Sequence, residues 1–218
     1  KKNRASGADL RPLTTAQRGV YFAHLLDKSG VAFNTAHYRD INGAVDLEVF
    51  SQAVEAALNC VPAYCVSVVL HEEIPCARDF GGGELGLSHL DVSQEPEPLA
   101  AALRWMECER NLAFDLENGP LFRICLIKLG PNHHFLFHCY HHIIVDGAGI
   151  YQLERWVFEI YDNLKSGRAL DLPCNQSDAL DVEDFYRNSL SFADDKEYWL
   201  KTLKGLDPQV SLSGKDRQ

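Results

Sequence analysis

One stretch constrains the fold of this chain more than any other: HHFLFHCYHHIIVDGAG, at residues 133–149. In its first half, Phe135, Phe137 and Cys139 alternate with polar or amphipathic neighbours, which is the period of a strand with one buried face. After it, apolar residues recur over 150–164 at the spacing of one helix face. The stretch therefore predicts a strand, a short loop and a helix, and loops held between rigid elements often carry catalytic groups.

The residue types in this loop suit proton transfer. A histidine has an unperturbed pKa of about 6.5, so His141 or His142 can accept a proton from an attacking amine, hydroxyl or thiol near neutral pH. We expect Asp146 to hold the shape of the loop, and Gly147 to permit a backbone angle or a close approach that a Cβ would block.

Two other interpretations of the loop remain open from the residues alone. In the first, the histidines and Asp146 only form hydrogen bonds to the backbone. In the second, His141, His142 and Asp146 bind a metal ion. Adjacent histidines on an extended chain point to opposite faces, which argues against both binding one ion, so we predict no metal site here.

Composition excludes several classes of protein. The 218 residues carry a net charge of -10, whereas a nucleic-acid surface needs a basic footprint. No apolar run approaches the length of a membrane helix, and the first ten residues lack the apolar core of a signal peptide. The 7 cysteines form no close CxxC pair, which favours a reducing, cytoplasmic setting.

Periodicity and capping residues predict a mixture of helices and strands, typical of an α/β or α+β open sandwich. The glycines at 81–83 are expected in a hairpin or loop, because no phosphate-loop lysine follows them. The predicted helices are Thr15–Asp27, 47–59, 98–112, Ile150–Lys165, Val182–Leu190 and Ala193–Lys204. The predicted strands are Ala32–Gly43, Tyr64–Leu70, Leu87–Val92, Leu121–Leu129 and Phe135–Tyr140, the last two forming a hairpin.

Four segments resemble one protein family. HHIIVDG at 141–147 matches the HHxxxDG motif of the condensation domains of non-ribosomal peptide synthetases, within the chloramphenicol acetyltransferase-like superfamily. ENGPLFR at 117–123 resembles the family's lead-in strand, LTTAQR at 13–18 its opening segment, and 195–203, with Tyr198 and Trp199, its "YW" helix. The resemblance covers nearly the whole chain in the family's order. The chain departs from it at 60–68, where CVPAYCVSV replaces a segment whose arginine helps to hold the motif loop.

The resemblance implies a fold and a domain organisation. Condensation domains have two acyltransferase-like lobes arranged in a V, with the active site between them, and are about twice as long as this chain. We therefore expect residues 1–11 to be a flexible lead-in, 12–205 to form the N-terminal lobe, and 206–218 to be an inter-lobe linker or truncated end. The isolated lobe is expected to be inactive without the C-terminal lobe.

The resemblance also implies a reaction, which is amide formation. One carrier protein brings an acyl or peptidyl thioester on its phosphopantetheine arm, and a second brings the amine of an aminoacyl thioester. His142 would orient that amine or remove its proton, and His141 would support the loop. Asp146 would fix the loop through an ion pair, and Gly147 would let the backbone approach the thioester.

The implied partners are the donor and acceptor carrier proteins, the C-terminal lobe and an adjacent adenylation domain, with no cofactor bound by this chain, no nucleic acid and no membrane. AHYRDINGAVD at 36–46 resembles siderophore synthetases. Two alternatives remain: a stand-alone acyltransferase that uses coenzyme A, and a carrier-protein-binding module whose catalytic motif has decayed.

Overall fold

The computed structural model describes residues 10–79, 86–169 and 179–205. The chain divides into two compact units, Lys1–Gln176 and Ser177–Gln218. The glycines at 81–83 and the predicted end segment 206–218 lie outside the described residues. Within the described ranges, no helix has both the length and the apolar character needed to cross a membrane.

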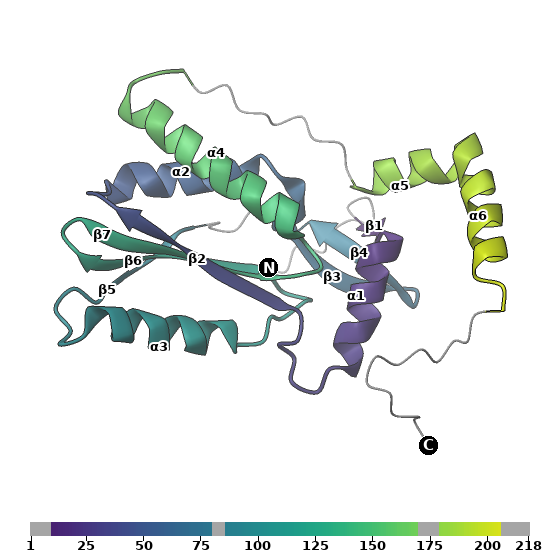
Figure 1. Cartoon of the computed structure of the whole chain (residues 1–218), viewed down its shortest axis with the longest axis horizontal. Helices are drawn as coiled ribbons and strands as arrows, with labels where there is room; N and C mark the ends of the chain where they lie inside the picture. The colour runs from purple at the N-terminus through teal and green to yellow at the C-terminus, as the bar shows by residue number, and fades with distance from the viewer. Residues whose placement is uncertain (1–9, 80–85, 170–178, 206–218) are drawn as a thin grey trace, which may run out of the picture. The chain divides into compact units, whose positions relative to one another are not determined.

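A four-stranded sheet forms the centre of the first unit (Figure 1). Its order is β2-β7-β6-β5, with antiparallel pairing except between β5 and β6, which are parallel. The hairpin predicted from the alternating residues is confirmed, with Phe122 opposite Tyr140. The strands are β2 (Asn34–Asn42), β5 (Ser88–Asp91), β6 (Phe122–Gly130) and β7 (His133–His141).

Three helices cover this sheet, with α2 (Leu47–Asn59) and α4 (Gly147–Lys165) on one face and α3 (Pro98–Arg110) on the other (Figure 1). The Asp46 side chain caps α2 by accepting a hydrogen bond from the Val49 N–H, as its residue type predicts. Because helices lie on both faces, β7 is buried along nearly its whole length, which makes its end a rigid base for the motif loop.

A second sheet of the first unit has the order β1-β4-β3, from β1 (Leu10–Pro12), β3 (Val66–His71) and β4 (Ile74–Asp79). Leu10 and Arg11 pair with β4 as part of β1, whereas the sequence placed them in the flexible lead-in at 1–11. The strand predicted from Tyr64 begins at Val66 instead, because a 3₁₀ helix (Pro62–Cys65) precedes it and the proline fits its first turn.

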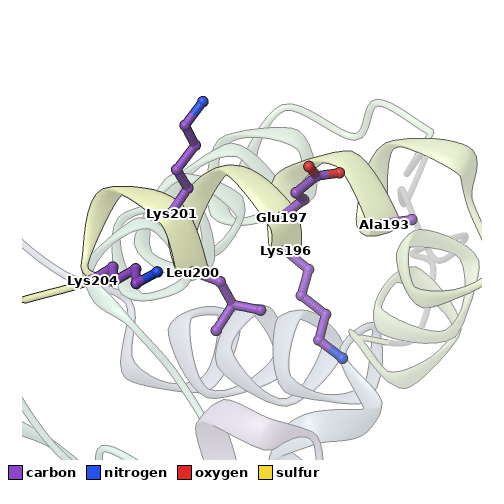
Figure 2. Close-up of a pocket in the computed structure, with 6 residues that line it drawn as sticks. All are labelled: Ala193, Lys196, Glu197, Leu200, Lys201 and Lys204. Atoms are coloured by element: carbon purple, nitrogen blue, oxygen red, sulfur yellow. The ribbon is translucent and has the colours of Figure 1, made fainter.

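The helix α1 (Thr15–Leu26) follows β1 and begins with a capping box. Thr14 accepts from the Gln17 N–H, and the Gln17 side chain accepts from the Thr14 N–H. The second unit consists of α5 (Ala179–Arg187) and α6 (Leu190–Thr202). Each begins three residues before its predicted start. A shallow hollow on α6 is lined by α6 and by Lys204 just beyond it, and includes none of the motif residues (Figure 2).

Candidate active site

The motif loop, residues 142–146, joins the end of β7 to the start of α4. The N–H of His141 donates to the Leu121 carbonyl over 2.9 Å, and the N–H of His142 donates to the Phe33 carbonyl over 2.8 Å. The loop is therefore held on both sides, by the residue before β6 and the residue before β2. Both tethers are backbone bonds, so they fix the loop whatever the neighbouring side chains are.

His142 is exposed, and one of its ring nitrogens is fixed. Its Nδ1 lies 3.0 Å from the Val145 carbonyl oxygen. A carbonyl only accepts, so Nδ1 must carry the proton in this bond. In the neutral imidazole, Nε2 is then the nitrogen with the free lone pair, which is the form a proton acceptor needs. The loop thus selects the tautomer of His142 and presents a basic nitrogen at its surface.

His141 is completely buried, in contrast to its neighbour. Its Nδ1 accepts a hydrogen bond from the Ile143 N–H over 3.2 Å, and its Nε2 lies 3.2 Å from Nδ1 of His24. Burial, with smaller contributions from the nearby charges of His24 and His142, lowers the pKa of His141 to about 4. The ring is therefore neutral at pH 7, and its contacts are to the Ile143 backbone within the loop and to His24 of α1.

The buried His141 gives a prediction about acid stability. Unfolded, it takes up a proton below about pH 6.5, but folded it does so only near pH 4. Between these values the unfolded state binds more protons, so the free energy of unfolding falls as the pH falls, by up to about 1.4 kcal/mol per pH unit. Urea unfolding between pH 7 and 4.5 measures this slope. His141→Asn keeps an acceptor near the Ile143 N–H and should reduce the slope. An equal slope in both proteins would contradict the prediction.

Asp146 caps α4. Its side chain accepts a hydrogen bond from the Gly149 N–H over 2.8 Å. The predicted ion pair is not formed with any residue in the described part of the chain, and the N-cap bond holds the carboxylate in its place. A carboxylate here also faces the positive end of the helix dipole, which adds to its stabilisation of α4.

The steric role predicted for Gly147 is wrong within this lobe. Gly147 is the first residue of α4, and a Cβ there would meet no atom within 4 Å. The crowded glycine is instead Gly149, two residues after the motif, where a Cβ would lie 2.8 Å from Cγ2 of Val145. Whether the Gly147 backbone approaches a thioester stays a prediction.

Two substitutions at Asp146 distinguish its role as the N-cap of α4 from a role in an ion pair. We expect Asp146→Ala to lower the free energy of unfolding by about 1 kcal/mol, because α4 loses its N-cap. Asp146→Asn should retain nearly all of the stability, because asparagine caps as well as aspartate does. Chemical denaturation of the three proteins checks this. An equal loss in both variants would show that the charge matters, as an ion pair requires.

Sequence analysis missed several residues that hold the loop. Nε2 of Gln17 donates to the Ile143 carbonyl over 3.1 Å, so the side chain that completes the capping box of α1 also contacts the motif. The signal was present in Thr14 and Gln17 at capping-box spacing, but their contact with residue 143 depends on the fold. His24 and Phe33 reach the motif only because β2 pairs with β7 and α1 lies close by, which no local pattern encodes.

The chain is similar to known proteins along nearly its whole length. The chain matches the condensation-domain family over residues 8–218. It belongs to that family. It is 34% identical over 214 residues to the isonitrile lipopeptide synthase of Streptomyces coeruleorubidus, covering 95% of this chain and 14% of the relative. It is 32% identical over 203 residues to a dimodular nonribosomal peptide synthase of Bacillus subtilis, covering 92% of this chain and 8% of the relative.

Solved condensation domains share the fold. A mutant of the starter condensation domain of rhizomide synthetase RzmA, in complex with C8-CoA, is similar with a TM-score of 0.86 at 25% identity. The match covers 96% of this chain and 49% of that one. This chain thus spans about half the length of a solved condensation domain and a small part of the length of the synthetases that it matches. The predicted chloramphenicol acetyltransferase-like fold is confirmed, and the length agrees with one lobe.

Proposed function

We propose that this chain is the N-terminal lobe of a condensation domain in a non-ribosomal peptide synthetase, and that His142 acts on the attacking amine. The observation that carries the proposal is the state of the His142 ring. The bond from Nδ1 to the Val145 carbonyl orients the ring and leaves Nε2 as a free base on an exposed loop. His141, whose tautomer is also fixed by a backbone bond, is buried, so the exposure of the free Nε2 is what distinguishes His142.

The proposed reaction joins two carrier-bound thioesters. The acceptor amine attacks the carbonyl carbon of the donor thioester, so a C–N bond forms and the C–S bond breaks. Nε2 of His142 accepts the proton that the amine loses and then releases it to the departing thiolate on the donor phosphopantetheine arm, which leaves a free thiol and a neutral imidazole. Holding amine and thioester in contact contributes to the rate independently of the base. No cofactor resident in this lobe is needed.

The proposed partners are the donor and acceptor carrier proteins, the C-terminal lobe and an adenylation domain of the same synthetase. The proposed location of the synthetase is the cytoplasm. The relation to siderophore synthetases predicted from residues 36–46 concerns the product and stays part of the proposal. Peptide mass spectrometry of the source cell tests the organisation, because peptides that continue past Gln218 in a larger polypeptide support a synthetase.

Reconstitution tests the reaction. The complete condensation domain is mixed with a donor carrier loaded with an acyl group and an acceptor carrier loaded with an amino acid, and the acceptor is weighed by intact mass spectrometry. We expect an added acyl group on the acceptor only when both carriers are loaded, and none with the 218-residue chain alone. Acylation of a free amine by acyl-coenzyme A with this chain alone would contradict the proposal and favour the coenzyme A-dependent acyltransferase.

A further inference from the structure

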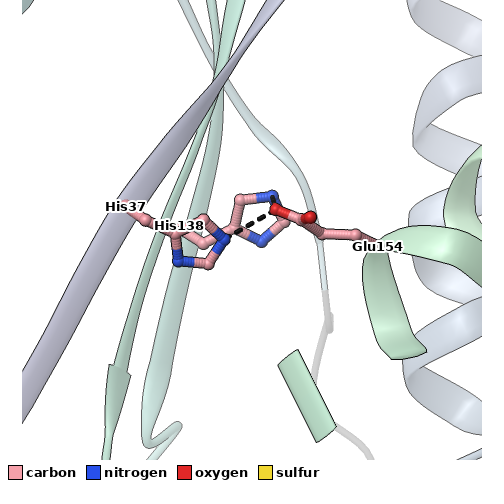
Figure 3. Close-up of side chains that lie close together, drawn as sticks. All are labelled: His37, His138 and Glu154. Carbon is pink, nitrogen blue, oxygen red and sulfur yellow. Dashed lines mark hydrogen bonds and ion pairs between the residues drawn. The ribbon is translucent and has the colours of Figure 1, made fainter. Parts of the chain in front are cut away.

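Three ligand-type side chains meet between β2, β7 and α4, away from the motif loop. Figure 3 shows His37 from β2, His138 from β7 and Glu154 from α4 turned toward one another. Each offers one ligand atom, and these atoms lie within 4.8 Å of one another. Over the described ranges, this is the one such group of three or more, and it contains no motif residue.

The His138 ring nitrogen is the unusual feature of this cluster. The side chain is completely buried, and its Nε2 has no hydrogen-bond partner among the described residues. Oε1 of Glu154 lies 3.7 Å away, which is too long for a hydrogen bond. A buried polar atom without a partner costs stability, so its persistence beside a carboxylate points to a ligand.

The surroundings prepare the ligand atoms for a cation. Nδ1 of His138 lies 2.6 Å from the Tyr140 hydroxyl, and a proton on Nδ1 leaves the lone pair on Nε2, aimed at the cluster. Nε of Arg39 donates to Oε2 of Glu154 over 2.7 Å, which leaves Oε1 as the inward-facing oxygen. Metal-binding histidines and carboxylates are oriented by outer partners of this kind.

We propose that His37, His138 and Glu154 form a binding site for a divalent transition-metal ion, with Zn²⁺ the best match. Two imidazole nitrogens and one carboxylate oxygen are a donor set that zinc uses with an open fourth position. Mg²⁺ and Ca²⁺ prefer oxygen ligands, so the two nitrogens select against them. This site is independent of amide formation.

Binding requires a small rearrangement at His37. Its Nε2 lies 2.6 Å from Oε1 of Glu154, and its ring stacks on that of His138 at an interplanar angle of 7°. Stacked parallel rings hold their lone pairs in two separate planes, so the His37 ring must turn for both nitrogens to meet one ion. It has room, because β2 is an edge strand and the His37 side chain is 30% exposed. That exposure also lets the ion reach the site from solvent and leaves its fourth coordination position open to water.

Titration with Co²⁺, followed by competition with Zn²⁺, tests the site in the full chain. We expect one equivalent of Co²⁺ to give visible bands without a thiolate charge-transfer band, since the ligands are nitrogen and oxygen. His37→Gln and Glu154→Gln should weaken binding at least tenfold. Tyr140→Phe should weaken it by about 10–100-fold, as loss of an outer partner does. His133→Gln is the matched control on β7 and should bind like the wild type.

Each result of this experiment either supports the metal site or overturns it. His37 is partly exposed on an edge strand, so His37→Gln is expected to fold even if Glu154→Gln does not, and circular dichroism checks both. Zn²⁺ should raise the melting temperature of the wild type and of His133→Gln but not of His37→Gln. Absence of binding, a thiolate band, or equal affinity in His37→Gln and the wild type would overturn the proposal and leave a buried charge network only.

Discussion

Replacing His142 with alanine is expected to lower the rate of amide formation by about 10²–10⁴-fold, the usual contribution of a general base. The ring makes one side-chain hydrogen bond, to the carbonyl of Val145 in its own loop, and it is exposed, so its loss should leave the fold intact. The loss should fall on kcat more than on KM, because the proton moves in the transition state and not on binding. Reconstituted carriers and single-turnover kinetics with the complete condensation domain provide the measurement.

His133→Ala is the control for this experiment. His133 begins β7 and is bonded to Asp40, at the opposite end of the strand from His142. The His133→Ala variant should form amide at the wild-type rate. That result would show that losing a histidine from this strand does not by itself lower the rate. Unchanged amide formation in His142→Ala would remove His142 from the mechanism. It would then favour the module that binds carrier proteins but has lost catalysis.

Local patterns were sufficient to predict the elements that position the site. The alternation in 135–139 and the apolar spacing after residue 150 each report one buried face, and the structure has β7 and α4 there. The start of α4 was predicted three residues late, at Ile150, because Gly147 and Gly149 are poor helix formers whose cost is offset by the Asp146 cap.

The contacts that complete the site depend on topology. Glu154 carried a signal in the sequence, since it falls on the apolar face of α4 between Ile150 and Val157. A charged residue in such a stripe predicts a buried partner, but not which one. Its partners His37 and Arg39 are 117 and 115 positions away and reach it only because β2 pairs with β7 in this register.

The segment at 60–68 carries a buried tyrosine in place of the arginine that the family resemblance led us to expect. Tyr64, placed by the 3₁₀ helix, is buried against Phe122 and Tyr140, with ring centroids 5.8 Å apart in both pairs. Burial raises the pKa of Tyr64, and the nearby carboxylate of Asp146 raises it further. An aromatic side chain thus packs against Phe122 and Tyr140, the strand residues that lead into the hydrogen bonds of the motif loop.

Tyr64→Ala should therefore lower the free energy of unfolding by about 3–5 kcal/mol, the range for removal of a buried aromatic ring. Tyr64→Phe separates the ring from its hydroxyl, which has no hydrogen-bond partner among the described residues. Because an unpaired buried hydroxyl costs stability, Tyr64→Phe should be as stable as the wild type or more so. Chemical denaturation measures both. A loss of more than about 1 kcal/mol in Tyr64→Phe would mean that the hydroxyl is bonded, and that a polar contact as well as packing holds this side chain.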